Sequence, residues 1–284
     1  MNEPSLLRCM TALMLEPWLL TPAMHNTLCE IVMAHMTNAD AQHVKAASFG
    51  KNPAPREYGM VGDGVAVVPV DGVIGRKFSS SLYSSGVTSV DVLARLLRDA
   101  GDDPQVKSVL MLMDSPGGSV QGVPEAGYAV KALTEKKPVI AYADGLMCSA
   151  AYWIASQANA IYSWNESTIG SIGVYSAHLD TSRKAENEGA VVEMFKSGKF
   201  KGMGYPGTSL TDEERAMIQR RVDEIGVQFR STVRAGRDPR QISDDTMQGQ
   251  SFSAAESIQN GLIDGICSMG DAVLECEMAA KLRG

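Results

Sequence analysis

Between Val65 and Asn159 the sequence alternates short, continuously apolar runs with segments of helical periodicity. The apolar runs, such as VAVVPVDGVIG from Val65 and SVLMLMDS from Ser108, have the length and β-branched content of buried strands, and we interpret the first as a strand pair. Segments such as VPEAGYAVKALTEK from Val123 are typical of helices. Strands that are apolar on both faces need helices on both sides, so this alternation predicts an α/β fold.

The rest of the body follows the same alternation. A strand is predicted at 138–145 and a helix at 149–159. The clearest helix spans 208–236, because Thr211 and Glu214 have the spacing of a capping box and the apolar residues after them share one helical face. Periodicity alone leaves the order of the strands open.

Composition changes along the chain predict four segments. An N-terminal helical segment covers 1–37, with an amphipathic helix at 22–36. A linker rich in small, polar, glycine and proline residues covers 38–64. The globular body covers 65–268, and a C-terminal helix covers 269–284.

Charge and cysteine content exclude several classes of function. The formal net charge of −7 and the pI near 5.2 argue against a nucleic-acid-binding surface, which needs clustered lysine and arginine. The five cysteines are scattered without CxxC spacing, so we expect no metal or redox centre and a reducing compartment. Charged residues and prolines interrupt the apolar runs of the first 36 residues, so neither a membrane anchor nor a signal peptide is expected.

The stretch DSPGGSV, residues 114–120, is the first candidate for chemistry. It follows a predicted strand, and its two glycines, Gly117 and Gly118, would let backbone N–H groups approach a ligand, as in an oxyanion hole. A plain turn between strand and helix explains the same residues. Phosphate binding is disfavoured because the chain has no GxxxxGK[ST] pattern.

A second candidate is MCSAAYW, where Cys148 and Ser149 stand side by side at a predicted helix start. Ser149 there is either a nucleophile, whose oxyanion the free helix N–H groups would meet, or a simple N-cap. Cys148 is the rival nucleophile, but a thiolate usually needs a histidine. His178 is the only histidine in the body, and a lone histidine is more often structural.

The third candidate is FKSGKFKGMG, residues 195–204, with three lysines in a glycine-containing loop: Lys196, Lys199 and Lys201. Solvated surface charge is the usual meaning of such a cluster.

Taken in order, six motifs resemble the signal peptide peptidase A, or protease IV, family of Ser-Lys peptidases over roughly residues 65–268. They are DSPGG, MCSAAYWIASQAN, STIGSIGV, SGKFK, LTDEERAMIQRRVDE and GQSFSAAESIQNGLID. The leading EPWLLTPAM and the cysteine before the serine are most similar to the capsid-assembly (head maturation) peptidases of lambda-like tailed phages and prophages.

The resemblance implies a Clp-protease/crotonase-like spiral of ββα units with an N-terminal helical appendage. It implies Ser149 as the nucleophile and Lys201, at the SGxxK position, as the general base, with Cys148 as packing. Ser171 would orient the lysine amine, and the backbone N–H groups of Gly118 and Ala150 would form the oxyanion hole. This chemistry needs no metal and no cofactor.

A lysine base must be desolvated. A free lysine has a pKa of ~10.4, so only about one molecule in 2,500 carries a neutral amine at pH 7. Burial beside apolar groups favours the neutral amine. Phe195, Phe200 and Met203 are the expected apolar neighbours of the base.

The resemblance therefore predicts a serine endopeptidase that processes a capsid or scaffold polypeptide in the host cytoplasm or within a procapsid. Shorter members of the family form rings, which implies a homo-oligomer with shared active sites. The alternatives are a cellular signal-peptide-degrading peptidase, a non-catalytic capsid-associated protein of the same fold, and a crotonase-type acyl-CoA enzyme.

Overall fold

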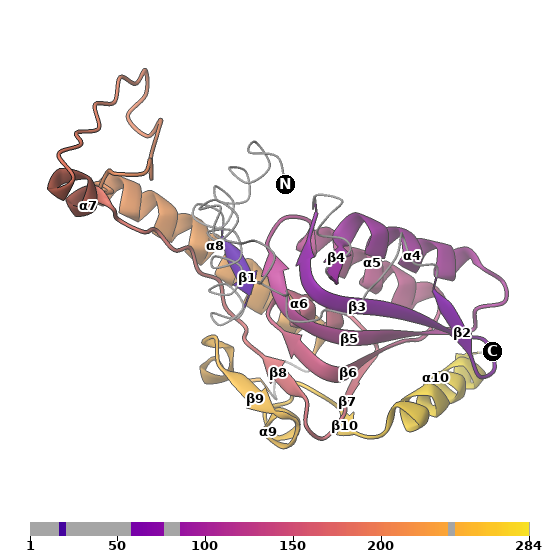
Figure 1. The fold of residues 1–284 in the computed structure, drawn as a ribbon. Coiled ribbons are helices and arrows are strands. Elements are labelled where there is room, and N and C mark those ends of the chain that lie inside the picture. Colours follow the sequence, from indigo (N-terminus) through magenta and orange to yellow (C-terminus); the bar gives the residue numbers. More distant parts are fainter. Residues whose placement is uncertain (1–16, 21–57, 77–85, 238–241, 284) are drawn as a thin grey trace, which may run out of the picture.

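The structure is a computed structural model that describes residues 17–20, 58–76, 86–237 and 242–283, and its centre is one ten-stranded sheet (Figure 1). The main path of the sheet runs β10-β7-β6-β5-β3-β2. The strands are β1 (Trp18–Leu20), β2 (Gly59–Val61), β3 (Val65–Gly75), β4 (Val87–Ser89), β5 (Ser108–Ser119), β6 (Val139–Cys148), β7 (Ala160–Ser163), β8 (Thr168–Gly170), β9 (Ser251–Ser253) and β10 (Gly265–Ile266).

Helices cover both faces of this sheet. The helices are α4 (Val90–Asp102), α5 (Val123–Lys136), α6 (Ala150–Ala155), α7 (Ser182–Asn187), α8 (Asp212–Gly236), α9 (Ala254–Gln259), α10 (Met269–Arg283) and the 3₁₀ turn η1 (Asp245–Met247). The helices α4, α5 and α6 contribute to the larger apolar core, and α10 packs on the opposite face through Ala272 and Cys276 (Figure 1). The predicted α/β class is confirmed, and β3, β4 and α4 form a unit of the predicted ββα order.

The apolar strands are parallel and buried on both faces. In β3, Val65 belongs to the core under α10, whereas the next residue, Ala66, belongs to the core under α4 and α5. This alternation follows from the two-residue period of a strand. Covering both faces accounts for the continuous apolar runs in the sequence.

Two predicted boundaries in the sheet are wrong. VAVVPVDGVIG is one strand, β3, rather than a pair, because β3 pairs with β5 on both sides of a bulge between Asp71 and Val73. The residues DSPGGS continue β5 instead of forming a turn, because Gly117 and Gly118 pair with Val73 and with Ile74 of β3.

The N-terminal region also differs from the prediction. Residues 18–20, placed in the helical segment 1–37, form β1, and residues 59–61, placed in the linker 38–64, form β2 against β3. The body of the fold therefore begins before Val65. The predicted helix at 22–36 lies outside the described residues.

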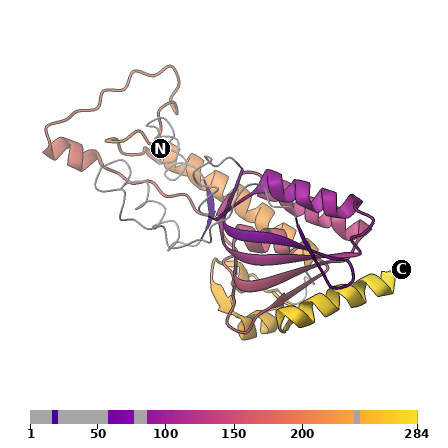
Figure 2. The same ribbon diagram turned by 45° about the vertical axis from the view of Figure 1, so that its right-hand side comes forward.

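The long helix α8 joins the body to a projecting arm, which we define as residues 180–217. The capping box of Thr211 and Glu214 is present as predicted. Near the other end of α8, Phe229 stacks on Trp153 of α6 with ring centroids 4.7 Å apart. The first turns of α8, with α7 and the loop between them, extend away from the sheet in both views (Figures 1 and 2).

No helix in the described part of the chain is both long enough and apolar enough to cross a membrane.

Candidate active site

Ser149 lies in a strained turn between β6 and α6. Its φ of 55° with a ψ of −115° is a sparsely populated backbone conformation for a non-glycine residue, at a cost on the order of 1–3 kcal/mol. Its N–H donates to the carbonyl of Gly170 at 2.7 Å, and the residue is 1% exposed. Within the described structure the Ser149 side chain makes no capping hydrogen bond to α6, so the N-cap explanation for this serine fails. Strain of this kind is concentrated at functional sites.

Ser171 lies beside Ser149 because of strand pairing. Cys148, the last residue of β6, is opposite Gly170, the last residue of β8, so each serine directly follows one member of this pair. Ser171 also has a left-handed φ, 51°, and the two serines are the only non-glycine residues with positive φ in the described part of the chain. The N–H of Ser171 donates to the carbonyl of Gln250 at 2.7 Å. This fixed backbone would let the Ser171 hydroxyl position another side chain beside Ser149.

The glycine pair of β5 forms the wall next to Ser149. A Cβ atom built on Gly117 would lie 2.9 Å from the Cβ of Ser149, and one built on Gly118 would lie 1.8 Å from the carbonyl oxygen of Ile74. Neither position can carry a side chain without movement of its neighbours, so the backbone of β5 reaches the serine directly. Ala150 is the first residue of α6, where N–H groups have no partner within the helix.

Cys148 is buried in the sheet rather than presented to a substrate. Its thiol donates to the carbonyl oxygen of Thr168 at 3.5 Å. Burial raises the pKa of the Cys148 thiol to about 11, so the reactive thiolate is scarce at neutral pH. Among the described residues, the hydrogen-bond neighbours of the Cys148 thiol are Thr168 and Ser251 rather than His178.

We expect Cys148 to resist iodoacetamide in the native protein up to about pH 9, because its raised pKa keeps the thiol protonated there. Peptide-level mass spectrometry after alkylation measures this, and the partly exposed Cys267 serves as the internal control. Alkylation of Cys148 should become rapid after unfolding in urea. Rapid modification of native Cys148 at pH 8 would contradict its assignment as packing.

The candidate base, Lys201, is not near Ser149 within one chain. It lies exposed in the loop of the arm, before the first turn of α8. From Asp212, where α8 begins, to Phe229, where it meets α6, the helix rises about 25 Å. The structure therefore brings together Ser149, Ser171 and the glycines but leaves Lys201 apart.

The three lysines of the arm differ in their surroundings. Lys199 forms an ion pair with Glu213 at 3.1 Å and lies over the ring of Phe200. The amine of Lys201 has no hydrogen-bond or ion-pair partner among the described residues. Phe195, an expected apolar neighbour of the base, is 93% exposed. The described residues of one chain do not form the desolvated environment that a lysine base needs.

Strand β1, which was not predicted as a strand or as part of the site, lies against the site. It pairs antiparallel with the glycine end of β5, with Leu19 opposite Gly118. On its other edge, the N–H of Trp18 donates to the carbonyl of Tyr175 at 2.8 Å, and the N–H of Tyr175 donates back at 3.2 Å. The leading EPWLLTPAM of the sequence was the one signal that pointed to these residues.

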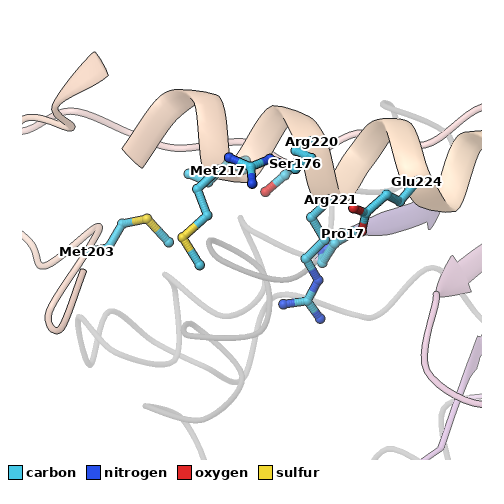
Figure 3. A pocket seen from close by; sticks show the side chains of 8 residues that line it. Pro17, Ser176, Met203, Met217, Arg220, Arg221 and Glu224 are labelled. Atoms are coloured by element: carbon cyan, nitrogen blue, oxygen red, sulfur yellow. The ribbon is translucent and has the colours of Figure 1, made fainter. Parts of the chain in front are cut away.

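A cavity of about 350 Å³ lies where β1 approaches α8 (Figure 3). Its lining comprises Pro17, which precedes β1, Ser176, Met203 of the arm, and residues of α8, among them Met217 and Arg221. Ser149 does not line this cavity, so it is distinct from the candidate active site.

Comparison with known proteins identifies the family of this chain. The sequence profile of peptidase family S49 matches residues 131–283. The capsid assembly protease C of Escherichia phage lambda is 29% identical over 87% of this chain and 57% of its own length. The head-tail preconnector protein GP5 of Enterobacteria phage P21 is 32% identical over 83% of this chain and 47% of its own. The chain thus spans about half the length of these two relatives.

Cellular proteins and solved structures also match. Protease 4 of Haemophilus influenzae is 29% identical over 81% of this chain and 37% of its own length. Among structures, a ClpP1 mutant from Listeria monocytogenes has a TM-score of 0.45 and 15% identity, covering 73% of this chain and 94% of that one. The 1510-N membrane-bound stomatin-specific protease has a TM-score of 0.45 and 13% identity, with coverages of 76% and 85%. Because the S49 profile covers more than half of the sequence, from within α5 to the end of α10, the chain belongs to peptidase family S49.

Proposed function

We propose that this chain is a serine endopeptidase in which Ser149 attacks the peptide carbonyl. The observation that carries the proposal is the strained turn at Ser149, which holds the serine against the backbone of Gly117 without a capping role. A structural serine has no need of a left-handed backbone at a strand end. A nucleophilic role of the Ser149 hydroxyl accounts for the strained backbone, because such strain is found where a side chain must be held in position for a reaction.

In this proposal a neutral lysine amine, that of Lys201, removes the proton from the Ser149 hydroxyl as the oxygen attacks. The N–H groups of Gly118 and Ala150 stabilise the oxyanion of the tetrahedral intermediate. The intermediate collapses to an acyl-enzyme, and the departing amine takes the proton back from the lysine. The Lys201 amine then deprotonates a water molecule, whose oxygen attacks the acyl carbon. The lysine returns this proton to the Ser149 oxygen as the acyl group leaves as a carboxylic acid. Ser171 holds the amine in place.

The base is supplied by a neighbouring copy of the chain in this proposal. Lys201 is carried on an arm that extends from the body, and its amine has no partner among the described residues. Several apolar side chains of the arm are exposed, including Phe195 and Tyr205. Docking of the arm on a second copy would bury these side chains and desolvate the lysine together, in a homo-oligomer with shared sites.

The proposed substrate is a polypeptide of a phage or prophage head, either a capsid or a scaffold protein. Support comes from the two phage relatives, whose names describe capsid assembly and a head-tail preconnector. The host cytoplasm or the procapsid is the corresponding place of action. Protease 4 of Haemophilus influenzae supports the cellular peptidase as the second candidate.

We expect Lys201→Ala to lower the rate of cleavage of β-casein, an unstructured polypeptide, by at least ~10²-fold, because it removes the general base. Lys199→Ala is the matched control: it loses only an exposed ion pair with Glu213 and should stay within a few-fold of the parent protein. Mass spectrometry of the products measures both rates. A parent protein that cuts nothing would contradict the peptidase function, and a silent Lys199→Ala beside an active Lys201→Ala would contradict the choice of lysine.

A further inference from the structure

We propose that Trp18–Leu20 occupies the substrate groove of its own chain, in the place of an extended polypeptide, and must leave before a substrate can bind. The identification of the groove as a substrate site rests on the proposed peptidase function. The occupancy itself rests on the contacts of β1.

The first observation is that β1 is bonded along both edges. It pairs antiparallel with Gly117–Ser119 of β5, and Trp18 exchanges two backbone hydrogen bonds with Tyr175. A short segment inserted between two backbone edges has the geometry by which proteins bind extended peptides, where main-chain bonds provide affinity and side-chain sites provide selectivity. The same groove would therefore accept a polypeptide from outside.

The second observation places a carbonyl group beside the nucleophile. Successive residues of a strand direct their backbone groups to opposite edges, so if those of Trp18 face Tyr175, those of Leu19 face Gly118. A Cβ atom built on Gly117 would lie 2.1 Å from the Leu19 carbonyl oxygen and 2.9 Å from the Ser149 Cβ. The Leu19 carbonyl thus lies next to Ser149 and opposite a proposed oxyanion donor, where the scissile carbonyl of a substrate belongs.

The third observation concerns the side chain of Leu19. It is 0% exposed and belongs to the main apolar core, although it comes from a three-residue strand remote from the core in sequence. The groove therefore contains a site for one apolar side chain next to the proposed nucleophile.

A tethered occupant competes strongly with free peptides, because its effective concentration is on the order of mM. External substrate binds only in the fraction of molecules from which β1 has left, so its apparent affinity falls by that fraction. Weakening β1 should therefore strengthen binding of an external peptide.

The first experiment releases β1 in a Ser149→Ala background, where binding can be measured without cleavage. The probe is a fluorescein-labelled peptide with the sequence of residues 16–22, EPWLLTP, followed by anisotropy. We expect Leu19→Asp to bind this probe at least ~10-fold more tightly than the Ser149→Ala parent. The matched control is Leu282→Asp, the same change at a residue that is 89% exposed on α10, and it should bind as the parent does.

The second experiment locks β1 in place and does not depend on a destabilising change. Trp18 and Ser119 are opposite each other and the backbone bonds of Trp18 point away from β5, which makes Trp18→Cys with Ser119→Cys a suitable disulfide pair. The oxidised protein should neither bind the probe nor cleave β-casein, and dithiothreitol should restore both to the level of the two single variants.

The outcomes test the occupancy of the groove and the peptidase function separately. If the oxidised, disulfide-linked protein binds the probe and cleaves β-casein as the reduced protein does, or if no disulfide forms, the occupancy is overturned. A folded Leu19→Asp variant, checked by thermal melting, with no gain in probe binding would also overturn it. A gain in binding in the Ser149→Ala background, together with no cleavage of β-casein by Leu19→Asp with Ser149 intact, would instead leave the occupancy in place and refute the peptidase function.

Discussion

Ser149→Ala should abolish cleavage of β-casein, whereas Cys148→Ala should keep most of it. Loss of a serine nucleophile removes the covalent route and costs about 10⁴-fold or more in turnover. The thiol of Cys148 lies in the sheet, where burial raises its pKa to about 11, so its removal takes no reacting group from the site. The rate of product formation by mass spectrometry measures the difference between the two variants.

Because Cys148 and Ser149 are adjacent, each substitution tests whether a change at this place in the fold lowers activity by itself. Cys148→Ala empties a small volume in a fully buried position, so thermal melting should accompany the kinetics. Equal loss of activity in two folded variants would contradict Ser149 as the sole nucleophile. Full activity of Ser149→Ala would refute the proposed mechanism.

Two inactive variants, Ser149→Ala and Lys201→Ala, should recover activity when they are assembled together. If each site takes its serine from one chain and its lysine from a neighbour, an equal random mixture has both residues in roughly a quarter of its sites. The physical reason is the separation seen within one chain, where α8 alone rises about 25 Å between the arm and α6. Co-expression or co-refolding, followed by the β-casein assay, measures the recovered fraction.

Varying the ratio of the two variants provides an internal control. Recovered activity should pass through a maximum near equal amounts and vanish for either variant alone, because both residues become limiting in turn. A co-assembled mixture that stays inactive at every ratio would refute shared sites and require Lys201 to reach Ser149 within its own chain.

Elements whose signals are local agree with the sequence prediction. Helix α5 spans Val123–Lys136, the segment whose periodicity predicted a helix, and α8 begins with the predicted capping box at Thr211. Helical hydrogen bonds and caps join residues three or four apart, so a short stretch of sequence contains the information needed. The continuous apolar runs likewise indicated a sheet covered on both faces.

Strand boundaries depended on partners that are distant in sequence. Nothing within DSPGGS indicates that it extends β5, since its extended form is stabilised by pairing with Val73 and Ile74 of β3. The same holds for Trp18–Leu20, whose three residues form a strand only because β5 and Tyr175 supply backbone partners on both edges. An isolated three-residue strand has no stability of its own.

The sequence alone determined the α/β class and, through its ordered motifs, which residue types to expect at the site. Only the tertiary structure decided how those residues meet. Pairing of Cys148 with Gly170 sets Ser149 beside Ser171, burial keeps Cys148 protonated, and α8 holds Lys201 away from both serines. These relations depend on strand register, desolvation and helix length acting between residues far apart in the chain, and no local pattern of side chains encodes them.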